Sequence, residues 1–163
     1  AKWVEYMNSD APSTVADMRR ENGRQKPWHV KYLGIGNEAW GCGGNMIPEY
    51  YSALFRRYTT YTRDYQGDLY KIASGASDDD TNWTEVCMKA IGNRMDAIAV
   101  HYYTAFGWTP GAKGQALDFD KDTYFKTLSK ACEIENVIKK HIMVMDRLDP
   151  EHNIDLLVDE WGT

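Results

Sequence analysis

Short apolar segments rich in β-formers alternate with amphipathic segments along the whole chain, and this order limits the folds that are possible. Complete strands are expected at 28–36, 70–73, 95–100 and 154–158, after a strand end at 3–6. Helices are expected at 13–22, 48–66, 82–91 and 120–145. Strict alternation with nearly continuous apolar strands is typical of a parallel sheet covered by helices. About five strands and about four helices amount to half of a (β/α)8 TIM-barrel, so we predict a partial barrel.

A doubly wound sheet has the same alternation, but no GxGxxG motif follows a strand, which weakens that alternative. No linker-like segment divides the chain, so residues 1–163 are predicted to form one partial barrel domain. The chain starts without Met inside an expected strand, and it stops three residues after Glu160. We therefore expect it to be a fragment of a longer chain.

The composition excludes several classes of function. A net charge of -5 gives no basic surface for nucleic acid, and no apolar run approaches the roughly 20 residues that span a bilayer. The three cysteines form no CxxC pair, which argues against a zinc site. Asp78, Asp79 and Asp80 lack the glycine and distal glutamate of a calcium loop, and are predicted to begin a helix. We expect no metal and no cofactor.

Two glutamates occupy positions at which (β/α) barrels carry catalytic residues. Glu38 and Glu160 each follow an apolar strand, and each has a tryptophan within two positions. The carboxyl ends of parallel strands meet at one edge of the barrel, so the two side chains can face one substrate. Glycosidic bond cleavage uses one carboxylic acid and one carboxylate, about 5 to 5.5 Å apart in retaining enzymes. The alternative is a pair of surface glutamates without catalytic function.

Several segments together resemble the α-L-arabinofuranosidases of glycoside hydrolase family 51. They are residues 31–41, which include Gly36-Asn37-Glu38, residues 100–103 (Val-His-Tyr-Tyr), residues 158–162 (Val-Asp-Glu-Trp-Gly), and the opening 3–6 with Arg20 and Asn22-Gly23. The resemblance covers essentially the whole chain. It implies a barrel segment from the end of strand three to strand seven.

The resemblance implies a retaining mechanism with Glu38 as the acid/base and Glu160 as the nucleophile. A neighbouring negative charge and partial burial are expected to raise the pKa of Glu38. Asn37 matches the family residue that binds the sugar 2-hydroxyl. Period-two alternation would send Asn37 and Glu38 to opposite faces of a strand, and Gly34 and Gly36 predict a bulge or close backbone approach that resolves this conflict.

Four further side chains are candidates for the substrate site. His101 and Tyr103 match the His-x-Tyr of the family, where the histidine could bond a catalytic carboxylate and the tyrosine could orient Glu160 or contact the sugar. Trp40 and Trp161 could form subsite walls, or they could be core residues. A histidine that ends an apolar strand can also be purely structural.

The resemblance implies removal of terminal α-L-arabinofuranosyl groups from polysaccharides or oligosaccharides by double displacement, without a cofactor. A related two-glutamate glycosidase acting on β-glucan or xylosides is one alternative, and a catalytically incomplete fragment is another. The family also suggests a homo-oligomer by analogy. No signal peptide is visible, so a cytoplasmic and a secreted or periplasmic location both stay open.

Overall fold

The computed structural model describes residues 1–163 as a four-stranded parallel sheet with helices. The strands are β1 (Tyr32–Ile35), β2 (Tyr70–Ser77), β3 (Ala97–Tyr103) and β4 (Asp155–Gly162), paired in the order β1-β2-β3-β4. The helices are α1 (Lys2–Asn8), α2 (Thr14–Glu21), α3 (Pro48–Tyr61), α4 (Thr81–Ile91), α5 (Lys121–Cys132) and α6 (Ile134–Leu148), with a short 3-10 turn, η1 (Gly92–Arg94). The α/β class and the parallel sheet predicted from the sequence are confirmed.

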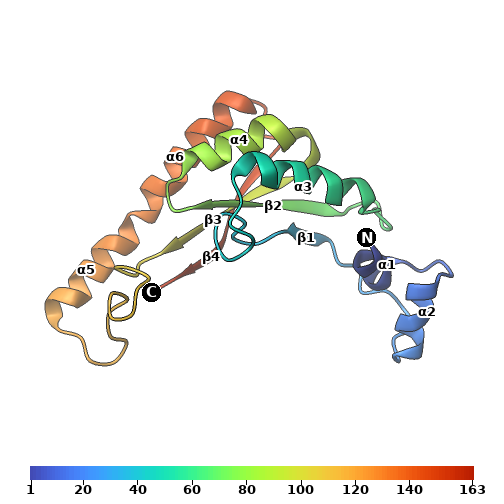
Figure 1. Cartoon of the computed structure of the whole chain (residues 1–163), viewed down its shortest axis with the longest axis horizontal. Helices are drawn as coiled ribbons and strands as arrows, with labels where there is room; N and C mark the ends of the chain where they lie inside the picture. Colours follow the sequence, from blue (N-terminus) through green and yellow to red (C-terminus); the bar gives the residue numbers. More distant parts are fainter.

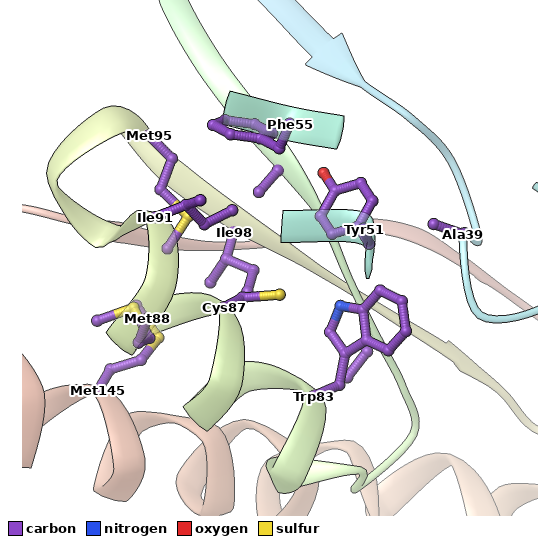
Figure 2. Packing of buried hydrophobic residues seen from close by; sticks show 12 residues of the cluster. Ala39, Tyr51, Phe55, Trp83, Cys87, Met88, Ile91, Met95, Ile98 and Met145 are labelled. Carbon is purple, nitrogen blue, oxygen red and sulfur yellow. The ribbon is translucent and has the colours of Figure 1, made fainter. Parts of the chain in front are cut away.

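Helices α3, α4 and α6 lie along one face of the sheet, and α1 and α2 extend beyond the start of β1 (Figure 1). The main core lies between those three helices and the sheet. Figure 2 shows the aromatic side chains of α3 and α4 facing one another there, with Tyr51 and Trp83 at a centroid distance of 5.6 Å. The core cluster comprises Ala39, Tyr51, Phe55, Ala73, Ala76, Trp83, Cys87, Met88, Ile91, Met95, Ile98 and Met145.

Helix starts follow the predicted signals. The Ser13 hydroxyl accepts a hydrogen bond from the Ala16 amide at the start of α2, and Pro48 occupies the first turn of α3. Asp80 accepts from the Trp83 amide and caps α4, which confirms the predicted role of this acidic stretch. These residues fix where α2, α3 and α4 begin.

Two predicted elements are wrong. Residues 3–6 are helical in α1, so there are four strands rather than five. A segment as short as this fits either a helix or a strand. The Asn8 side chain at the end of α1 makes two hydrogen bonds with the Val30 backbone, which hold the helix in place. The helix predicted at 120–145 is divided into α5 and α6 at Glu133, whose amide bonds Lys130 O in a tight turn. The Tyr102 hydroxyl also donates to that carbonyl.

No helix of the structure has the length and apolar character needed to cross a bilayer.

Candidate active site

Glu38 follows β1 in a glycine-rich loop that folds back on itself. β1 ends at Ile35, and the chain turns at Gly36, whose φ is +96°, so strand alternation no longer applies at Glu38. The amides of Gly41 and Gly43 both donate to the Glu38 carbonyl, at 2.8 and 3.0 Å. A Cβ at position 43 would lie 1.8 Å from the Asn37 carbonyl oxygen, so only glycine fits this loop.

Glu160 lies on β4 beside a break in the strand register. Val158 pairs with Val100 and Glu160 pairs with His101, which leaves Asp159 as an extra residue in β4. Such a β-bulge changes the direction of the side chains that follow it. Glu160 consequently faces the same side of the sheet as His101 and Tyr103.

His101 joins the two glutamates. Its Nδ1 atom lies 3.1 Å from Oε1 of Glu38 and 3.4 Å from Oε2 of Glu160, while its Nε2 atom lies 3.2 Å from Oδ1 of Asp159. One carboxylate oxygen from each glutamate and the histidine nitrogen all lie within 4.8 Å of one another. We call these four side chains the His101 cluster. The structure therefore brings Glu38 and Glu160, which are remote in sequence, to the same nitrogen of His101.

Tyr103, on β3, contacts Glu160. Its hydroxyl donates a 2.7 Å hydrogen bond to Oε1 of Glu160. This bond to a carboxylate raises the pKa of Tyr103, and desolvation acts in the same direction. The phenol stays a hydrogen-bond donor at neutral pH, as expected of a group that orients Glu160.

The expectation that the pKa of Glu38 is raised is wrong for this chain. Desolvation raises it, but hydrogen bonds from His101 and from the Cys42 thiol outweigh that effect, and the pKa is lowered. The side chain keeps one fifth of its surface exposed, which limits the desolvation. The expectation considered the negative charge of Glu160 and omitted the hydrogen bonds from His101 and Cys42.

Cys42 and Asp159 contact the predicted residues but were missed by sequence reasoning. The Cys42 thiol donates to Oε2 of Glu38 at 3.1 Å, and the available signal was the position of Cys42 between two glycines, four residues after Glu38. Asp159 was missed because period-two alternation places neighbours of Glu160 on the other face. The bulge that overrides this rule has no recognisable sequence signature here.

Besides Tyr103, which bonds Glu160, three of the predicted substrate residues lie outside the His101 cluster. Asn37 is exposed, next to Glu38. The Trp40 indole donates to the Gly75 carbonyl at 3.1 Å and packs against the core cluster. Trp161 is 70% exposed and borders a cavity with Tyr102 and Ile134, on the face of β4 that α5 and α6 approach.

Glu38, His101 and Glu160 are also close enough to offer three ligand atoms to a metal ion. The contacts of His101 with both glutamates account for this convergence without a metal, and we assign none.

A parallel sheet with helices along one face and a paired-carboxylate site at its carboxyl edge defines a segment of a (β/α) barrel. A family model described as "Alpha-L-arabinofuranosidase 1 domain" matches residues 1–121. The chain belongs to this family.

Individual relatives agree. The chain is 58% identical over 164 residues to an intracellular exo-α-L-arabinofuranosidase from Bacteroides ovatus, covering all of this chain and 32% of the relative. It superposes with a TM-score of 0.93 and 45% identity on the crystal structure of the family 51 arabinofuranosidase from Xanthomonas axonopodis pv. citri, covering 99% of this chain and 33% of that one. An α-L-arabinofuranosidase from Thermotoga maritima, solved as an arabinose complex, gives a TM-score of 0.78 at 25% identity, with 98% and 30% coverage. The chain thus spans about a third of the length of these relatives.

Proposed function

We propose that this chain supplies the catalytic pair of a retaining glycoside hydrolase that removes terminal α-L-arabinofuranosyl groups. The observation that carries the proposal is the convergence of Glu38 and Glu160, whose oxygens lie within 4.8 Å of each other. Retaining enzymes hold their two carboxyl groups about 5 to 5.5 Å apart, whereas inverting enzymes need about 6.5 to 9.5 Å to admit a water. The short separation favours double displacement.

Glu160 is the nucleophile in this proposal. Its carboxylate attacks the anomeric carbon, and the Tyr103 hydroxyl at 2.7 Å fixes the direction of the attacking group. Glu38 protonates the departing glycosidic oxygen. Once the glycosyl-enzyme forms, Glu160 has lost its charge and Glu38 has lost its proton, so Glu38 then accepts a proton from the attacking water.

The substrate class is inferred from the relatives. The Bacteroides protein is named an exo-α-L-arabinofuranosidase, which supports an arabinofuranosyl-containing oligosaccharide or polysaccharide as the partner here. Within this proposal, Asn37 binds the sugar 2-hydroxyl, and Trp40 and Trp161 border subsites. The exposed position of Asn37 beside Glu38 supports its role. The Trp161 ring is 70% exposed on the face of β4 that α5 and α6 approach, so a subsite there would lie on the other side of the strand from Glu160.

The test is a set of aryl glycosides with the complete protein that carries this chain. We expect turnover of the α-L-arabinofuranoside with the α-anomer of arabinofuranose as the first product, read by proton NMR. Turnover of the β-xyloside or β-glucoside without the arabinofuranoside would overturn the substrate assignment. A β-anomer as first product would overturn the retaining mechanism.

We further propose that residues 1–163 form one partial barrel domain that is weakly active or inactive in isolation. β1 and β4 each pair on one side only, which leaves two sheet edges open to other strands. The isolated chain is expected to associate on size-exclusion chromatography. Activity of the isolated chain equal to that of the complete protein would contradict this proposal.

A further inference from the structure

Two consecutive residues of β4 contact one imidazole ring. Side chains of neighbouring strand residues normally point to opposite faces of a sheet. Asp159 and Glu160 both reach His101 because Asp159 is the extra residue of the bulge between β3 and β4. Bulges next to active sites often redirect a side chain toward the site. The contact of Asp159 with His101 is therefore a candidate for a functional role.

The contacts lie on opposite edges of the ring. Asp159 lies 3.2 Å from Nε2, whereas both glutamates lie on the Nδ1 side, at 3.1 and 3.4 Å. His101 is buried, with 6% of its side chain exposed, while 44% of the Asp159 side chain is exposed. The ring is held between one carboxylate that faces solvent and two that face each other.

We propose that Asp159 is a positioning residue that fixes the orientation and proton placement of His101, and through it the approach of Glu38 to Glu160. The hydrogen bond of the ring joins Nδ1 to Oε1 of Glu38 at 3.1 Å. Oδ1 of Asp159 lies 3.2 Å from Nε2, within ion-pair range, so its negative charge favours a proton on that nitrogen as well.

The catalytic consequence rests on the proposed function, but the contact between Asp159 and His101 does not. Asp159 acts through His101 rather than on the sugar. Its loss therefore disturbs the alignment of the two glutamates more than the binding of substrate. The expected signature is a lower kcat with an unchanged KM.

The kinetic test uses Asp159→Asn in the complete protein. The asparagine keeps the shape of the side chain, but it removes the negative charge beside Nε2, and its amide can donate to that nitrogen, so a proton on Nε2 is no longer favoured. We expect kcat on an aryl α-L-arabinofuranoside to fall by about 10- to 100-fold, with KM changed less than about twofold. Asp155→Asn is the matched control, because it makes the same change on the same strand, where the carboxylate bonds the Tyr70 hydroxyl and not His101.

A second readout does not depend on activity. In protein labelled with 15N-histidine, the signals of His101 are assigned by their loss in His101→Gln, and they report which ring nitrogen is protonated. We expect a protonated Nε2 in the unmodified protein and loss of the proton from Nε2 in Asp159→Asn.

The outcomes separate the two proposals. If the complete protein turns over no arabinofuranoside, the proposed function fails, and the NMR spectra alone decide the role of Asp159. An unchanged His101 spectrum in Asp159→Asn would overturn the positioning role. A changed spectrum with kcat equal to that of Asp155→Asn would overturn it as well, because the histidine would then not transmit the effect to the glutamates.

Discussion

The hydroxyl of Tyr103 donates a 2.7 Å hydrogen bond to Glu160 Oε1, so a side chain of β3 holds the predicted nucleophile of β4. Hydrogen bonds to an ionised carboxylate are stronger than those between neutral groups. Tyr103→Phe removes such a bond and should therefore lower kcat/KM by about 10- to 100-fold. Tyr102→Phe is the control, because that hydroxyl donates to Lys130 O in α5. Equal rates for the two variants would refute the orienting role of Tyr103.

The two glutamates should respond differently to substitution. Glu160→Gln removes the attacking oxygen anion and should abolish turnover of every substrate. Glu38→Ala should cost about 10²- to 10⁴-fold with poor leaving groups and much less with an activated aryl leaving group that needs no proton. Added azide should restore part of the Glu38→Ala rate by replacing the water that the base activates. A glycosyl azide of retained configuration from Glu160→Gln, and not from Glu38→Ala, would reverse the two roles.

The Cys42 thiol should influence the pH profile of catalysis. Its hydrogen bond to Glu38 is one of the contributions that lower the pKa of that carboxyl, together with the larger one from His101. In the proposed mechanism Glu38 is the general acid and must be protonated, so its pKa sets the alkaline limb of kcat/KM. Cys42→Ala removes a lowering contribution and should move that limb to higher pH. Cys132→Ala, which changes an exposed free thiol in α5, should leave the limb in place.

Core packing beneath the sheet should be sensitive to truncation. Phe55 is completely buried in the core cluster, whereas Tyr58 of the same helix is 60% exposed. Phe55→Ala should reduce the free energy of unfolding by about 3 to 5 kcal/mol through lost burial and the cavity left behind. Tyr58→Ala should change it by about 0.5 kcal/mol or less. Urea unfolding followed by tryptophan fluorescence measures both, and equal losses would contradict the assigned core.

Acid should weaken the contact between α4 and α6. Glu85 of α4 binds Lys89 and also Arg147 of α6, at 2.9 Å, and these two bonds lower its pKa. A carboxyl with a lowered folded-state pKa stabilises the fold above its unfolded-state value, near pH 4.3, and this contribution is lost as the pH falls through the folded-state value. Glu85→Gln should therefore reduce the drop in thermal midpoint on acidification below about pH 4.3. A pH dependence identical to that of the unmodified protein would show that the pair contributes nothing.

The sequence predicted the parallel α/β class and the meeting of Glu38 and Glu160, because both follow from strand order and from the shared edge of parallel strands. Apolar periodicity predicted the wrong structure at residues 3–6 and missed the break at Glu133. The four residues at 3–6, Glu5 among them, fit either element. At the break near Glu133, the Lys130 carbonyl accepts a hydrogen bond from Tyr102 of a distant strand, which periodicity cannot show. The contact of Asp159 with His101 depends on a register shift, which is a property of two paired strands together.

The sheet order has a consequence for the mobility of the site. Glu38 follows β1 and Glu160 lies on β4, the two outermost strands, and they meet only at His101 of β3. Their separation therefore depends on how all four strands are placed relative to one another, in addition to the loop that carries Glu38. Any bending of the sheet that moves β1 away from β4 would pull the proposed proton donor and the proposed nucleophile apart, so the stiffness of the sheet becomes a determinant of turnover.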